Sequence, residues 1–197
     1  MPRQGRPPLP RNVYSFESRD CPIPDVATLD SSFAVNALLS AEPHHDAARR
    51  FLESLAAHGT QLVFNRLLEL ELREVAFRYP LIQRYPRDWK RRRHDGRTLR
   101  MARTLIETTM GAWQELLSAF TYAIVPVDAV YAAVSELMDR YGLQSYDAVH
   151  AATAVEYSGR VIVTTDAGFA NVPEDLLVIY INSGRLPWCR QVRARRG

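Results

Sequence analysis

Residues 146–166 read YDAVHAATAVEYSGRVIVTTD, a helical pattern that runs directly into a β-branched strand and ends on an aspartate. The first part has the apolar spacing of an amphipathic helix, and the run RVIVTTD at 160–166 is rich in Val, Ile and Thr, as strands are. A helix followed by a strand is the unit that repeats in proteins with a parallel sheet. The same alternation of strand and helix continues on both sides of this stretch.

Four further apolar runs predict the remaining strands, at 26–30, 61–65, 122–127 and 176–181. Helical patterns separate them, and they include 67–77 and a segment that Gly142 closes. Apolar strands alternating with helices predict an α/β protein with a three-layer α/β/α fold and a mainly parallel central sheet of about five strands.

Composition divides the chain of 197 residues into three parts. Residues 1–24 are rich in Pro and Arg and are predicted to be a flexible leader, 25–183 are predicted to form the domain, and 184–197 form a basic tail. Within the domain, a basic helical insertion at about 80–120 interrupts the alternation. Its part from Pro80 to Arg103 is predicted to be a basic helical arm with a flexible elbow.

The chain contains no apolar run near the roughly 20 residues that cross a bilayer, so no membrane association is expected. Its two cysteines are too few for a disulfide framework and fit a reducing compartment. We therefore expect a soluble, cytoplasmic protein.

Acidic residues follow two of the predicted strands at the point where each ends. Asp30 ends the strand at 26–30 and Asp166 ends the strand at 160–166. Asp147 falls in the first turn of the helix predicted from YDAVHAATA at 146–154, with Ser145 as the expected N-cap. Glu71 lies about two helical turns beyond the strand at 61–65. Ligands of parallel sheets bind beyond the carboxyl ends of the strands, so these four carboxylates are expected to converge there.

Four converging carboxylates repel one another unless they are protonated or share a cation. A cluster of oxygen ligands without Cys or His suits Mg²⁺ or Mn²⁺ rather than zinc or copper. Each acid also has a structural explanation: Asp147 can favour a helix N-terminus, Asp166 can form an Asx-turn, and Glu71 can be a solvated helix residue. His150 is interpreted as a helix-packing residue.

Four segments together resemble a known family: LDSSFAVNALL at 29–39, NRLLELELREV at 65–75, LQSYDAVHAATA at 143–154 and VIVTTDAGF at 161–169. Their order and spacing are similar to those of PIN domains, particularly VapC-like toxin ribonucleases, over about 26–182. The resemblance implies four catalytic and metal-binding acids with two supporting hydroxyls, which are Asp30, Glu71, Asp147 and Asp166, and Ser32 and Thr165.

The resemblance also implies the activity and partners. The family cleaves RNA with Mg²⁺ or Mn²⁺, often as homodimers, and its toxin members are held inactive by a protein antitoxin. In the family, the second acid usually lies six residues after a small hydroxyl residue. Glu71 lies six residues after Asn65, which stands where Ser or Thr is commoner, so we choose Glu71 over Glu69 and Glu74. We therefore expect a metal-dependent endoribonuclease that is the toxin of a toxin–antitoxin pair.

The basic insertion is the second functional feature of the sequence. Residues 80–103 carry nine Lys or Arg against two acids, while 104–189 carry ten acids against three Arg. Arg91, Arg92 and Arg93 are therefore predicted to bind RNA phosphates, with Tyr85 and Trp89 able to stack on bases. A solvated helix face or a contact with an acidic partner explains the same charge equally well.

Two other classes of function remain open. The first is a catalytically silent PIN-like module that binds RNA or acts as a scaffold, although all four acids are retained. The second is a phosphoryl-transfer domain that uses Asp30, which is weakened because no second Asp follows two residues later and no suitable Lys ends a strand.

Overall fold

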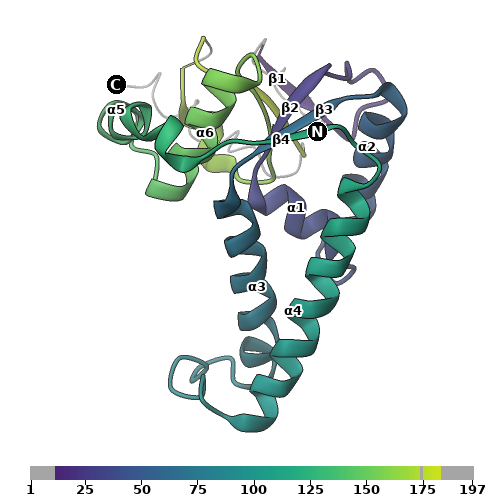
Figure 1. The fold of residues 1–197 in the computed structure, drawn as a ribbon, viewed down its shortest axis with the longest axis vertical. Helices are drawn as coiled ribbons and strands as arrows, with labels where there is room; N and C mark the ends of the chain where they lie inside the picture. Colours follow the sequence, from purple (N-terminus) through teal and green to yellow (C-terminus); the bar gives the residue numbers. More distant parts are fainter. Residues whose placement is uncertain (1–11, 174, 183–197) are drawn as a thin grey trace, which may run out of the picture.

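The computed structural model describes residues 12–173 and 175–182, and its centre is one six-stranded sheet (Figure 1). Every pair of neighbouring strands is parallel, in the order β1-β6-β5-β2-β3-β4. The predicted α/β fold is confirmed, with six strands where the sequence indicated about five. The strands are β1 (Val13–Ser15), β2 (Val26–Leu29), β3 (Gln61–Phe64), β4 (Tyr122–Ile124), β5 (Val161–Val163) and β6 (Val178–Ile181).

Side chains alternate between the two faces of this sheet and build one hydrophobic cluster on each. In β3, Leu62 and Phe64 belong to one cluster and Val63 to the other, as the two-residue period of a strand requires. The first cluster includes residues of α1 (Ser31–Leu38), α2 (His45–His58), α3 (Arg66–Arg84) and α4 (Gly96–Leu117). The second includes residues of α5 (Tyr131–Tyr141) and α6 (Ser145–Tyr157), so the domain has the three layers that the sequence predicts.

Local sequence signals set several helix ends. Gly142 adopts φ +67° at the end of α5, a left-handed conformation that favours glycine, as predicted. Asn65 caps α3 by accepting a hydrogen bond from the backbone N–H of Leu67. The N-cap of α6 is Gln144 rather than the expected Ser145, which is the first helical residue.

Helices α3 and α4 pack as an antiparallel hairpin that extends away from the sheet (Figure 1). Within the predicted basic arm, α3 continues through Pro80 to Arg84 and α4 begins at Gly96, so the turn between the two helices lies at 85–95. A proline inside a helix costs about 3 kcal/mol. Burial of Pro80 and Leu81 in the hairpin offsets that cost.

The sheet begins earlier in the chain than the predicted leader boundary. Val13 pairs with Ile179, so β1 lies inside the 1–24 segment that was predicted to be flexible. Phe16 fixes this segment by packing its ring 5.4 Å from Phe33 and 5.5 Å from Phe51. The many prolines hide this short strand in the sequence. Residues 1–11 and the predicted tail at 184–197 lie outside the described residues.

Within the described residues, no helix has the length and apolar character needed to cross a membrane.

Candidate functional site

The carboxyl ends of three neighbouring strands bring the predicted acids to one edge of the sheet. Asp30 follows β2, Asp166 comes three residues after β5, and these strands pair directly. Glu71 lies on α3, which follows β3 on the other side of β2. Asp147 lies in the first turn of α6. The pairing of β2 with β3 and β5 therefore places the predicted acids at the same edge of the sheet.

Hydroxyl groups orient the Asp30 carboxylate, which is only 2% exposed. Both Ser32 and Thr164 donate to its Oδ2 atom, and the Thr164 hydroxyl lies 2.7 Å away. Thr164 Oγ1 also accepts from the backbone N–H of Asp166 at 2.8 Å. Thr164 thus connects two of the predicted acids, and sequence reasoning missed it.

Thr165, the hydroxyl that the resemblance implies, has a different position. Its backbone N–H donates to Ser32 Oγ at 3.0 Å, and its own hydroxyl accepts from Asn36 Nδ2 at 3.2 Å. The Asn36 amide also donates to the backbone oxygen of Ser32 at 2.8 Å. Thr165 therefore supports Ser32 and Asn36, and reaches Asp30 only through Ser32.

This difference predicts that Thr164→Val destabilises the protein more than Thr165→Val. The first change leaves the Asp166 N–H without its acceptor and removes one donor from Asp30, at a cost of about 1–3 kcal/mol. The second leaves the Asn36 amide its bond to Ser32. Urea unfolding of both variants measures the two free energies. Equal losses would contradict the distinct role of Thr164.

A buried histidine lies between two of the acids. His150 is fully buried, and its Nε2 atom is 2.7 Å from Glu71 Oε2 and 3.9 Å from Asp30 Oδ1. Burial opposes protonation of the ring, but the hydrogen bond to Glu71 and the neighbouring carboxylates outweigh it and raise the pKa of His150. The interpretation of His150 as a packing residue accounts for its burial and misses this contact. Its spacing of three from Asp147, which puts both on one helix face, was the available signal.

Asp147 shows most clearly that the four acids lie near one another. Burial raises its pKa to about 6, and the charges of Asp30, Asp166 and Glu71 add to that rise. The charge of His150 acts in the opposite direction. The carboxylates therefore form a mutually repelling set, as the sequence predicts for this edge.

The three glutamates of α3 have different surroundings. Glu69 accepts a hydrogen bond from Trp113 Nε1 at 3.3 Å and pairs with Arg66 at 2.6 Å, so it joins α3 to α4. Glu74 Oε1 lies 3.5 Å from Arg78 Nε. Glu71 is the one of these three that contacts His150. This arrangement supports the choice of Glu71 from its spacing to Asn65.

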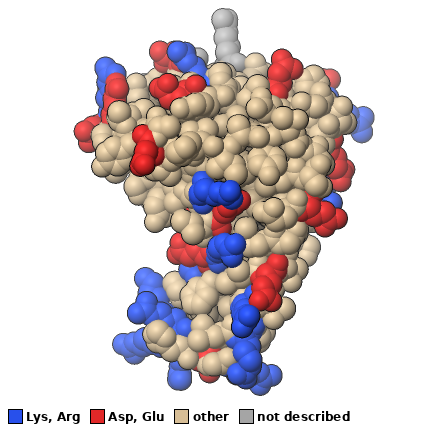
Figure 2. All heavy atoms as spheres, viewed as in Figure 1, with Lys and Arg blue, Asp and Glu red and all other residues tan. Residues whose placement is uncertain are grey.

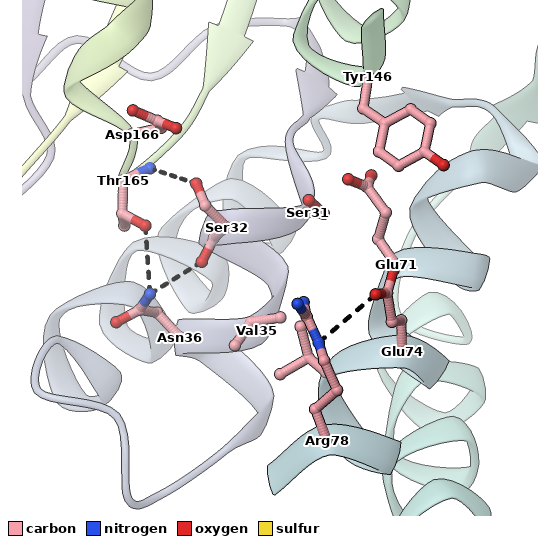
Figure 3. Close-up of a pocket in the computed structure, with 11 residues that line it drawn as sticks. Ser31, Ser32, Val35, Asn36, Glu71, Glu74, Arg78, Tyr146, Thr165 and Asp166 are labelled. Atoms are coloured by element: carbon pink, nitrogen blue, oxygen red, sulfur yellow. Dashed lines mark hydrogen bonds and ion pairs between the residues drawn. The ribbon is translucent and has the colours of Figure 1, made fainter. Parts of the chain in front are cut away.

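A surface cavity of about 540 Å³ opens beside these acids (Figure 3). Glu71 and Asp166 line it, whereas the buried Asp30 lies behind Ser32. Asp166 Oδ1 also accepts from the Gly168 N–H at 2.7 Å, so the Asx-turn that the sequence allowed is present. The complete lining is Ser31, Ser32, Val35, Asn36, Glu71, Glu74, Val75, Arg78, Tyr146, Thr165 and Asp166.

The donor chemistry of this edge fits a hard divalent cation. Carboxylate and hydroxyl oxygens are the ligands that Mg²⁺ and Mn²⁺ prefer. Burial is the main cause of the raised pKa of Asp147, and the neighbouring acids add a repulsion that a cation would relieve. As the side chains stand, no three His, Cys, Asp or Glu residues in the described part of the chain form a group that could hold a metal ion. The chemistry of the set, rather than its present spacing, thus fits a metal ion.

Positive charge gathers at the far end of the α3–α4 hairpin (Figure 2). Arg91, Arg92 and Arg93 are exposed in the loop between the two helices. Cations lie over the aromatic rings here, with Arg84 5.5 Å and Arg92 5.7 Å from the Tyr85 ring centre, and Lys90 5.7 Å from that of Trp89. The structure thus places Arg91, Arg92 and Arg93 in one exposed loop at the end of the hairpin, away from the acidic edge.

In a comparison with protein families, the model described as PIN domain matches residues 27–175 of the chain. This range includes all four acids, His150 and the whole hairpin. No curated protein matches the sequence of the chain.

Proposed function

The chain belongs to the PIN domain family, whose members are generally nucleases, and on this premise we propose that it is a metal-dependent endoribonuclease that cleaves RNA phosphodiester bonds. The observation that carries the proposal is the convergence of Asp30, Glu71, Asp147 and Asp166 at the edge of the sheet beside an open cavity. Asp30 is not a solvated surface residue, because its side chain is 2% exposed and two hydroxyls orient its carboxylate.

In the proposed mechanism, Asp30, Glu71, Asp147 and Asp166 would hold Mg²⁺ or Mn²⁺. The bound ion would supply a water of lowered pKa and neutralise charge at the scissile phosphate. Ser32 and Thr164 fix the direction of the Asp30 carboxylate, and His150 fixes that of Glu71. The chain therefore needs no nucleophile of its own and contributes chiefly the placement of its carboxylates.

A circular single-stranded RNA tests this proposal, because an exonuclease cannot begin on it. The purified chain with Mg²⁺ or Mn²⁺ is expected to linearise the circle, and EDTA is expected to stop the reaction. A circular DNA of the same sequence tests the preference for RNA. RNA binding without linearisation in any divalent ion would favour the silent RNA-binding module instead.

We also propose that the basic hairpin loop contributes RNA affinity while the acids perform the chemistry. Replacing Arg91, Arg92 and Arg93 together by Gln is expected to raise KM and to flatten its dependence on salt, with little change in kcat. The reason is that phosphate contacts of this kind are shared by the ground and transition states. Kinetics at saturating RNA, repeated over a salt series, measure both effects.

Arg49 and Arg50, which are exposed on α2, provide a control for this variant. Their replacement by Gln removes positive charge away from the loop. If the loop variant keeps the KM and the salt slope of the wild type, the loop does not contact RNA, and a role in binding an acidic protein becomes the better explanation.

The VapC-like motifs support a finer proposal, that the chain is the toxin of a toxin–antitoxin pair, acts as a homodimer and is inhibited by its antitoxin. A cytoplasmic location is part of this proposal because its RNA targets are there. Expression of the wild type is expected to arrest growth, and Asp30→Asn is expected to abolish the arrest. Light scattering of the purified chain tests the dimer.

A further inference from the structure

An aromatic side chain stands half exposed beside the acidic edge. Tyr146 is the second residue of α6, directly before Asp147, and it is 50% exposed. It lines the same cavity as Glu71 and Asp166. Figure 3 shows its ring at the end of the cavity where the Glu71 carboxylate lies. A half-exposed aromatic side chain is thus part of the lining of the cavity where the proposed chemistry would occur.

The side chains that line this cavity carry more negative than positive charge. Three of the lining residues are acids, Glu71, Glu74 and Asp166. Arg78 is the only cation among the lining residues that the structure describes, and its Nε atom lies 3.5 Å from Glu74. A phosphate backbone therefore gains little direct electrostatic attraction from these side chains. The proposed metal ion would attract the phosphate, and a contact that does not depend on charge would add affinity through a base.

We infer that Tyr146 is a stacking platform for an unpaired nucleobase beside the cleaved phosphate. The faces of nucleobases stack on tyrosine rings, and this contact tolerates any base because every base has a π-face. The cavity, at about 540 Å³, is within the size range of sites that hold small ligands. This inference rests on the proposed ribonuclease function and narrows its substrate class.

The expected substrate is consequently single-stranded RNA, in loops, bulges or ends. In a continuous duplex both faces of each base are covered by neighbouring bases, so no face is free for Tyr146. Unstacking a base in a duplex costs a few kcal/mol, which a single-stranded region does not require. The site is therefore expected to select against duplex RNA without reading its sequence.

The same helix offers a matched control. Tyr157 is the last residue of α6 and is 48% exposed, close to the exposure of Tyr146, but it does not line the cavity. Tyr157→Ala removes an equally exposed ring from the same helix. Tyr146→Phe keeps the ring face and removes only the hydroxyl. Together the two variants separate stacking from helix stability and from hydrogen bonding.

The test measures binding of a fluorescent single-stranded RNA to the full chain, with each variant first shown to keep the wild-type melting temperature. Tyr146→Ala is expected to weaken binding by about 5- to 100-fold. Tyr146→Phe and Tyr157→Ala are expected to bind as the wild type does. Because binding is measured directly, the result does not depend on whether the RNA is cleaved.

An abasic ribose, moved one position at a time along the RNA, locates the stacked base. At one position it is expected to weaken wild-type binding as much as Tyr146→Ala does, and to cause no further loss in that variant. Additive losses at every position, unchanged binding by Tyr146→Ala, or failure of Phe to substitute would overturn the inference. Absence of cleavage by the wild type with any divalent ion would instead contradict the proposed function.

Discussion

Replacing Asp30 by Asn is expected to lower RNA cleavage by at least about a hundredfold while the protein stays folded. Changing a residue that only supports a metal ligand lowers metal affinity or activity by about 10- to 100-fold, and Asp30 is itself a proposed ligand. Asn keeps an oxygen that can accept from Ser32 and Thr164, so the local network survives in part. The charge of Asp30 also contributes to the raised pKa of Asp147, so its removal relieves repulsion.

The thermal stability of the Asp30→Asn variant is therefore expected to equal or exceed that of the wild type. Melting temperatures without divalent ions measure this, and the variant should gain less stability than the wild type when Mn²⁺ is added. If the Asn variant cleaves RNA at the wild-type rate with unchanged metal dependence, Asp30 is not part of the site.

The second large effect is expected at Glu71, where replacement by Gln should reduce the cleavage rate about 10- to 100-fold. Gln removes the charge of a proposed metal ligand and changes the group that His150 contacts at 2.7 Å. Glu69→Gln is the matched control, since Glu69 lies two positions earlier on α3 and contacts Trp113 and Arg66 instead. It is expected to keep the wild-type rate within about threefold, because helix positions two apart face different directions and the Glu69 contacts join α3 to α4.

Rates measured under single-turnover conditions, at equal Mg²⁺ concentration, compare these variants with Glu74→Gln. Glu74 lines the cavity but contacts Arg78, so a smaller loss than at Glu71 is expected. A larger loss from Glu69→Gln than from Glu71→Gln would mean that the second acid of the site has been assigned to the wrong residue.

The layers of the fold could be predicted because the strands carry strong local signals. Strand β5 is β-branched throughout, and β3 alternates between two buried clusters. Strand β1 could not be predicted, because three residues within a proline-rich segment become a strand only by pairing with β6, far away in the sequence. The continuation of α3 through Pro80 likewise depends on packing against α4, which local propensity does not contain.

The four acids could be located from strand ends and motif spacing, whereas their partners could not. Thr164 and Thr165 are neighbours in sequence, and only the path of the chain after β5 determines that Thr164 reaches Asp30. His150 contacts Glu71 across 79 residues of sequence. His45, the first residue of α2, shows the same limit, since its Nδ1 atom lies 3.0 Å from the backbone oxygen of Asn36 in α1.

The rate of RNA cleavage as a function of free Mg²⁺, measured after EDTA treatment of the purified chain, tests the central claim most directly. The predicted result is no cleavage without a divalent ion, a rate that rises with Mg²⁺ and saturates, and recovery with Mn²⁺. Cleavage at the same rate in EDTA, or no cleavage at any concentration of either ion, would contradict the account.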